Sequence, residues 1–191
     1  MSATDRPLRA DAQRNRDRLL ASASRLFVEQ GLDATVGAIA KDAGVGMGTL
    51  YRHFPTREAL IEAAYRSELD AVCDAATTLL ETLPPEEAIR TWMDRFVDYM
   101  TTKIGMSDAL HAVISSGGNP FVHSRQRLNE VIELLLAAAH RAGATRPDAH
   151  ADDVLMTLSG IALAARSPSQ REQAGRMMDL LLDGLRYRPR T

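Results

Sequence analysis

The sequence has little of what disulfides, multi-thiolate metal sites and membrane spans require. Cys73 is the only cysteine among the 191 residues, which excludes an internal disulfide and any metal site built from several thiolates. No run of about 18 apolar residues occurs, and the first residues lack the apolar centre of a signal peptide. We therefore expect a cytoplasmic protein with no membrane partner, in which Cys73 is a small buried side chain.

Signals of catalysis and of cofactor binding are also scarce. The five histidines show neither His-x-x-x-His nor Glu-x-x-His spacing, so the zinc and di-iron sites that helices build are unsupported. Neither a phosphate-binding glycine loop of the Walker type nor a Gly-x-Ser-x-Gly turn is found. We predict no enzymatic activity, no cofactor and no metal site.

The sequence does contain a helical pattern along its whole length. Hydrophobic residues make up 45% of the chain, enough for a substantial core. They recur at helical spacing between glycine, proline and serine breaks, without the alternation typical of strands. We predict an all-α fold of about nine helices. Predicted helix starts include Asp11, Asn119-Pro120 and Pro147-Asp148.

Charge is unevenly distributed along the chain, although the net charge is only −2. Residues 1–60 hold nine Lys and Arg against seven Asp and Glu, giving +2, and the remainder holds 14 against 18, giving −4. Residues 1–10 include Arg6 and Arg9 without an apolar pattern and predict a flexible arm. Such an arm is either a plain tail or a basic segment that reaches DNA.

Residues 35–57 predict two short helices joined by a tight turn. Thr35 is a favoured N-cap for a helix over 36–43. Gly44 supplies the positive φ that a helix end and a sharp turn require. A second helix follows over about 47–54.

The order of side chains in this stretch is that of a helix-turn-helix motif. Ala40, Gly44, Val45 and Leu50 occupy its small, turn, plug and core positions. The outer face of the second helix carries hydroxyl, phenol, guanidinium and imidazole groups, which can contact DNA. A plain helical hairpin within a larger bundle is the alternative, and the outer-face chemistry favours the DNA-binding motif.

Residues 44–60, together with 26–35 and 39–43 before them, resemble the DNA-binding domain of the TetR family of bacterial transcriptional regulators. The resemblance covers about the first third of the chain. It implies a homodimer on a palindromic double-stranded DNA operator and a carboxyl-terminal helical domain that binds an inducer and dimerises. It also implies DNA contacts by Thr35, Gly46, Met47, Gly48, Thr49, Tyr51, Arg52, His53 and Arg57.

The resemblance further assigns roles to these residues. Thr49 and Tyr51 would contact phosphate, while Arg52 would face the bases, where a guanidinium can bond guanine with two hydrogen bonds. The sequence departs from the family pattern at Gly37 and Ala38, where members usually carry polar side chains. Neither residue can reach a base, so the first helix of the motif is expected to contribute little specificity.

Bulky side chains in the middle of the chain stand where the family keeps its inducer pocket. The resemblance therefore implies a small apolar or amphipathic ligand in contact with Trp92, Met93, Phe96, Tyr99, Met100, His111 and Phe121. Residues of these types at helical spacing also suit a plain core, and that alternative stays open.

The eighth and ninth predicted helices combine aliphatic rows with small residues that let helix axes approach closely, namely Gly160, Ala162, Ala164 and Ala165. Two copies can form a four-helix bundle. Burial within one subunit is the alternative, and the resemblance favours a homodimer through helices 8 and 9.

Together these features predict a helix-turn-helix DNA-binding domain of three helices over 1–58 and a larger helical ligand-binding and dimerisation domain over 59–191. The function expected is that of a sequence-specific transcriptional regulator, a repressor that a ligand releases from DNA. The alternative is a helical ligand-binding or protein-interaction module without specific DNA binding.

Overall fold

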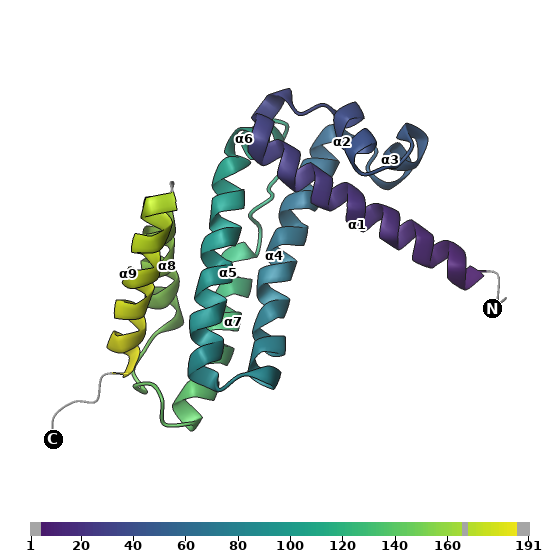
Figure 1. The fold of residues 1–191 in the computed structure, drawn as a ribbon. Helices are drawn as coiled ribbons and strands as arrows, with labels where there is room; N and C mark the ends of the chain where they lie inside the picture. The colour runs from purple at the N-terminus through teal and green to yellow at the C-terminus, as the bar shows by residue number, and fades with distance from the viewer. Residues whose placement is uncertain (1–4, 166–167, 187–191) are drawn as a thin grey trace, which may run out of the picture. The chain divides into compact units, whose positions relative to one another are not determined.

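The computed structural model describes residues 5–165 and 168–186, which form nine α-helices and one 3-10 helix and contain no strand (Figure 1). The all-α prediction is confirmed. The elements are α1 Asp5–Gln30, η1 Gly31–Asp33, α2 Val36–Asp42, α3 Met47–His53, α4 Arg57–Thr82, α5 Pro85–Gly105, α6 Ser107–Ser115, α7 Ser124–Arg141, α8 Ala151–Ala164 and α9 Pro168–Arg186.

The helices form two compact units. Unit 1 contains the described residues up to Glu68 together with Thr102–Pro120, and unit 2 contains Leu69–Thr101 and the described residues from Phe121 onward. Helices α4 and α5 each contribute residues to both units. The predicted division between 1–58 and 59–191 is a functional one, and it stays a prediction.

The core of unit 1 lies between α1 and the helix-turn-helix. The inward stripe of α1 is spaced at i, i+3 and i+4, as the sequence predicted, and its members are 6% exposed or less: Leu19, Leu20, Ala23, Leu26 and Phe27. Ile39 of α2 and Leu50 of α3 are also buried, at 0% and 1%. Burial of these apolar faces is what holds two helices of only seven residues each in place.

Helix α1 begins at Asp5, six residues before its predicted start at Asp11. The predicted flexible arm is therefore wrong for 5–10, and residues 1–4 lie outside the described part of the chain. Pro7 falls in the first turn of the helix, where a missing N–H breaks no hydrogen bond. The helix thus extends through a segment whose lack of apolar periodicity had suggested a tail.

Two other predicted helix starts are wrong. Helix α7 begins at Ser124 and not at Asn119-Pro120, because the chain turns first: the Ser124 amide donates to the Phe121 carbonyl at 3.1 Å. Helix α8 begins at Ala151 and not at Pro147-Asp148. The Asp148 carboxylate accepts both bonds of the Arg146 fork, at 2.6 and 2.7 Å, and so does not cap the helix.

The core of unit 2 is centred on α5. Trp92 is 1% exposed, and its indole N–H donates to the Val72 carbonyl of α4 at 2.9 Å. Cys73 is buried, as predicted, and this burial raises the pKa of its thiol to about 11. Among the described residues, no helix is both long and apolar enough to cross a membrane.

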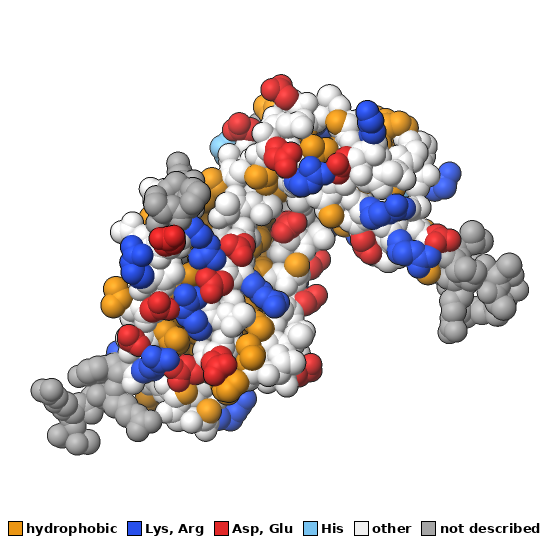
Figure 2. Space-filling view, in the orientation of Figure 1, with side chains coloured by type: hydrophobic (Ala, Val, Ile, Leu, Met, Phe, Trp, Pro, Cys, Tyr) orange, Lys and Arg blue, Asp and Glu red, His pale blue; other side chains and the backbone are white. Residues whose placement is uncertain are grey.

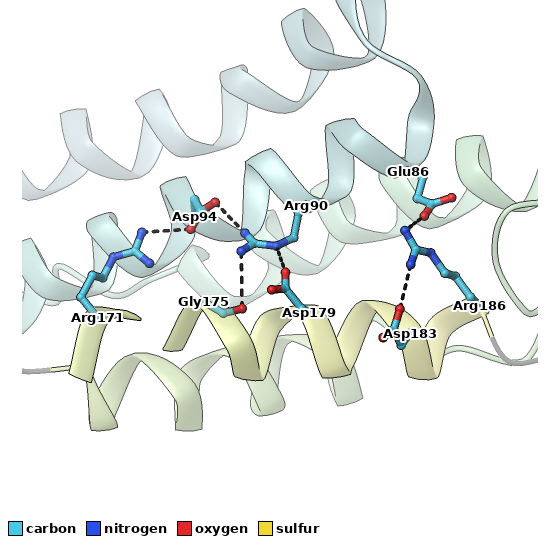
Figure 3. A network of polar contacts seen from close by, with 8 residues as sticks. All are labelled: Glu86, Arg90, Asp94, Arg171, Gly175, Asp179, Asp183 and Arg186. Carbon is cyan, nitrogen blue, oxygen red and sulfur yellow. Dashed lines mark hydrogen bonds and ion pairs between the residues drawn. The ribbon is translucent and has the colours of Figure 1, made fainter. Parts of the chain in front are cut away.

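A row of ion pairs joins α5 to α9 (Figure 3). Arg90 lies at its centre, where Nε donates to Asp179 at 2.6 Å and Nη1 donates to Asp94 at 2.6 Å. Two further arginines extend the row: Arg171 pairs with Asp94 and Asp98, and Arg186 pairs with Glu86 and Asp183. Because Glu86, Arg90 and Asp94 of α5 each pair with a residue of opposite charge on α9, this seam fixes the register of α9 against α5.

Candidate nucleic-acid interface

The turn of the helix-turn-helix has the geometry that its sequence predicts. Thr35 has an extended backbone, and its hydroxyl accepts a hydrogen bond from the Ala38 amide at 3.1 Å, so its role as N-cap of α2 is confirmed. Gly44 has a φ of +63°, a conformation that residues with a Cβ adopt only with strain. The Val45 amide closes the turn by donating to the Ala40 carbonyl at 2.9 Å.

Helix α3 has one buried and one exposed face. Leu50 and Phe54, one helical turn apart, are 1% and 3% exposed. On the opposite side, Met47 is 41% and Tyr51 48% exposed, and the exposed Arg52 lies beside them. Because Met47, Tyr51 and Arg52 share the solvent-facing side of α3 and include donors that suit base edges and phosphates, this exposed face is the candidate DNA-reading surface.

Three of the predicted contact residues of α3 differ in how far they reach solvent. Thr49 and His53 are half-buried, and the His53 ring centroid lies 6.1 Å from that of Phe54. Arg52 makes no hydrogen bond or ion pair with any residue that the structure describes. Its guanidinium is thus available to a partner, whereas Thr49 and His53 can present only part of their side chains.

The glycines of the motif leave open space around the backbone. A Cβ added at Gly46 or Gly48 would meet nothing within 4 Å, so a ligand can approach the first amides of α3 closely. The same is true at Gly37 in α2. Packing therefore does not require glycine there, and the exposed start of α2 simply lacks a side chain.

Arg57 directs its guanidinium into the protein. Its Nη2 donates to the Leu32 carbonyl at 2.6 Å and to the Ala34 carbonyl at 3.1 Å, and its Cζ lies 5.7 Å from the centre of the Phe27 ring. Its Nε is buried without a hydrogen-bond partner. The side chain ties the start of α4 to the segment that leads into α2, so any contact with DNA would compete with these bonds.

The other end of α2 is tied to α1. Arg25 forms an ion pair with Asp42. Hydrogen bonds from the Ser22 hydroxyl and the Arg25 guanidinium hold the pKa of the Asp42 carboxyl below its usual range. These contacts were not predicted, because the charge pattern of α1 does not show which of its arginines meets a residue 17 positions away. They join the carboxyl-terminal end of α2 to α1.

The predicted ligand-binding residues do not all come together. Trp92, Met93, Phe96 and Tyr99 of α5 are at most 4% exposed, and their rings lie in series, with centroids 5.6 and 6.0 Å apart. Met100 and Phe121 are half-buried in the same unit. His111 is exposed on α6 and belongs to unit 1, so it does not line this apolar cluster.

The apolar cluster is closed in this structure. The cavity between α5, α7, α8 and α9 has a volume of about 10 Å³, roughly the space of one water molecule. Its walls are apolar throughout: Ile89, Trp92, Met93, Ile132, Leu135, Leu136, Val154, Leu158 and Leu185. In this conformation the cluster is therefore a packed core.

Helices α8 and α9 expose an apolar stripe. On α8 it consists of Met156, 57% exposed, and Leu163, 51% exposed. On α9 it consists of Met177 and Leu180, of which Leu180 is 72% exposed. The exposed Gly160 and Gly184 lie beside them and have open space where a Cβ would stand, which suits close approach by another helix.

Two family models match the chain. Residues 19–64 match "Bacterial regulatory proteins, tetR family", and residues 84–187 match "Transcriptional regulator SbtR-like, C-terminal domain". The chain belongs to the TetR family of bacterial transcriptional regulators. The resemblance inferred from residues 26–60 is thereby confirmed.

Solved structures agree with this assignment over nearly the whole chain. The TetR transcriptional regulator SCO0520 from Streptomyces coelicolor is 54% identical, with a TM-score of 0.87, and the match covers 91% of this chain and 99% of that one. A TetR regulatory protein from Mycobacterium vanbaalenii is 35% identical, with a TM-score of 0.79 and coverage of 95% and 100%.

Curated relatives match about a third of the chain. An HTH-type transcriptional regulator of Staphylococcus aureus (strain USA300) is 42% identical over 64 residues, which are 33% of this chain and 35% of that protein. The match thus spans about a third of the relative's length. The chain described by the present structure is a DNA-binding transcriptional regulator of the TetR family and not an enzyme, since the families and relatives that it matches are regulators.

Proposed function

We propose that this TetR-family regulator is a dimeric repressor that binds a palindromic operator through α3 and leaves it when a small apolar molecule enters unit 2. The observation that carries the proposal is the exposed face of α3, where Met47, Tyr51 and Arg52 stand in solvent. This face has the residue types that read a major groove.

The proposed reading mode divides the work among few residues. Arg52 bonds a guanine, Met47 contacts a thymine methyl group, and Tyr51 donates to a phosphate. Thr49 contacts phosphate and His53 lies at the edge of the groove. Thr35 binds phosphate at the start of α2, and the open amides at Gly46 and Gly48 attract a further phosphate.

For Arg57, its two bonds to backbone carbonyls support a positioning role. By holding the start of α4 to the segment before α2, it keeps α2 and α3 in one orientation toward DNA. A phosphate contact of the same side chain is the family-based alternative, and it would require these bonds to open.

The proposed ligand is small, apolar or amphipathic, and it binds among the α5 residues Trp92, Met93, Phe96 and Tyr99, with Met100 and Phe121 at the side. Because the cavity is closed, binding must select a more open conformation. Such a conformation would change the separation of the two recognition helices in the dimer. Beyond about 34 Å, one turn of DNA, both can no longer dock.

The homodimer is proposed to form through the stripe on α8 and α9. Exposed Leu180 and Met156, beside the open glycines of the same helices, suit a four-helix bundle between two copies. An isologous contact of this kind matches a palindromic operator, because both then share a twofold axis.

The test is a salt titration of binding to the DNA upstream of the protein's own gene, with an unrelated duplex of equal length as control. The proposal expects tighter binding to the upstream duplex and a steep loss of affinity with salt. Equal, weak binding to both duplexes would support instead a helical ligand-binding or protein-interaction module without specific DNA binding. Trp92 is the only tryptophan, so a change in its emission reports ligand entry.

A further inference from the structure

The stretch of α1 from Ala10 to Arg18 has no buried apolar face. Between Ala10 and Arg18 no side chain is buried, and the first buried residue is Leu19. From Asp5 to Arg18 the sequence has five arginines and three aspartates, 5 − 3 = +2. Packing against a core stabilises most protein helices, and between Ala10 and Arg18 only Asn15 and Arg16 are even half-buried.

This basic segment lies beside the helix-turn-helix. Nη1 of Arg18 would be 3.7 Å from a Cβ added at Gly44, the residue at the turn before α3. Cζ of Arg16 lies 5.6 Å from the centre of the Phe54 ring, where α3 ends. The segment therefore lies beside the helix-turn-helix, near the turn before α3 and near the end of α3. Figure 2 shows Lys and Arg side chains over the α1–α3 part of the chain on the face in view.

Two of its arginines are open to a charged partner. Arg14 and Arg18, one helical turn apart, are exposed and line a shallow depression with Asp11, Asn15 and Asp17. Arg18 bonds only the neutral Asn15 in the described part of the chain, and Arg14 pairs with Asp11, with side chains 64% and 61% exposed. Exposed pairs of this kind contribute little to stability, so a phosphate can replace either partner.

We infer that Arg14 and Arg18 extend the proposed DNA interface onto α1 and bind phosphates that flank the bases read by α3. The partner is the backbone of duplex DNA, because the segment carries a net positive charge and continues the surface that begins at the Gly44 turn. Phosphate contacts carry no sequence information, but they fix the position of a protein on the duplex. The inference rests on the proposed function.

The experiment measures affinity against salt concentration for the full-length double variants R14Q/R18Q and R14K/R18K, on an operator duplex and on an unrelated duplex. The glutamine pair should lower the slope of log affinity against log salt by about 2 per protomer, equally on both duplexes. The lysine pair, which keeps the charge, should keep the wild-type slope. R66Q is the matched control, since Arg66 is exposed and pairs only with Glu62 on α4, at 2.6 Å.

An unchanged slope for R14Q/R18Q would overturn the inference, as would an equal loss in the lysine pair or a loss confined to the operator. Circular dichroism shows whether removal of Arg18 unfolds unit 1. If it does, R14Q alone must lower the slope of log affinity against log salt by about 1. An unchanged slope for R14Q would then overturn the inference. A wild-type chain that prefers no operator would instead contradict the proposed function. The slope on unrelated duplex still tests α1 in that case.

Discussion

Arg52 and Arg57 belong to one short stretch, and the structure gives them opposite environments. Arg52 extends into solvent from α3 and has no described partner, whereas Arg57 is half-buried and bonds two backbone carbonyls. A guanidinium without a protein partner can donate two parallel hydrogen bonds to a base edge. A guanidinium that already bonds the backbone stabilises the fold instead. The two residues therefore call for different tests.

Replacing Arg52 by alanine should lower affinity for the operator by about 1 to 3 kcal/mol and relax the preference at one base position. The physical reason is the loss of two parallel hydrogen bonds to guanine. Competition binding with operators changed at single positions measures this. R66A serves as control and should leave the preference unchanged. Equal weakening on every duplex would show that Arg52 contacts phosphate instead.

Replacing Arg57 by methionine should lower the free energy of unfolding by about 1.5 to 3 kcal/mol. The carbonyls of Leu32 and Ala34 would lose their charged donor, and only the apolar part of the side chain would still pack against Phe27. Urea unfolding, followed by helical circular dichroism, measures the change. R57K should recover only part of it, since an ammonium lacks the fork geometry. Full stability in R57M would remove the positioning role.

At the scale of elements, helix α9 is held by two kinds of contact, an apolar face and a row of ion pairs. Helix α9 buries Ala174, Met178 and Leu182, whereas its seam with α5 consists of the ion pairs centred on Arg90 (Figure 3). Arg90 is 25% exposed. Ion pairs in this setting are less screened than those at an open surface, and loss of the arginine leaves facing carboxylates.

R90M should therefore lower the free energy of unfolding by about 1 to 3 kcal/mol, because Asp94 and Asp179 then lose their shared donor. Urea unfolding provides the measurement. R125M is the matched control: Arg125 also bonds a carboxylate at 2.6 Å, but the two side chains are 62% and 51% exposed, and the change should stay under about 1 kcal/mol. Equal effects of the two changes would contradict a special role for the seam.

At the scale of the whole molecule, the stripe on α8 and α9 leaves large apolar side chains in solvent. Leu180 is 72% exposed, more than any other large apolar side chain described as exposed. A monomer gains nothing from presenting it to water. The stripe is therefore where two copies are expected to meet.

L180E should weaken the dimer by about 2 kcal/mol or more, roughly thirtyfold, because a carboxylate would lose its water at the interface. Sedimentation at micromolar concentration should show a shift toward monomer, and operator binding should weaken with it. L134E, at a position on α7 that is 43% exposed, should leave the dimer intact. A dimeric L180E protein, or equal dissociation of both variants, would rule out this stripe as the interface.

Much of the architecture could be predicted from local patterns. The helical spacing of Leu19 to Phe27, the cap at Thr35 and the glycine turn at 44 all depend on residues within a few positions of one another. The chain itself brings such residues together, and for this reason the all-α fold and the helix-turn-helix could be predicted. The false starts at Asn119 and Pro147 show the limit: the chain turns before Ser124 in the first case, and Asp148 bonds Arg146 in the second.

The sequence by itself thus determined the number of helices and the apolar face of most of them, but not where α1, α7 and α8 begin, since periodicity needs no knowledge of distant contacts. Only the tertiary structure decided that Arg57 bonds the carbonyls of Leu32 and Ala34 and that α9 meets α5 through arginines. It also decided that the cavity beside Trp92 and Met93 of α5 has a volume of only about 10 Å³. These outcomes depend on side chains that lie tens of residues apart. Whether such residues meet is decided by packing, which local spacing does not encode.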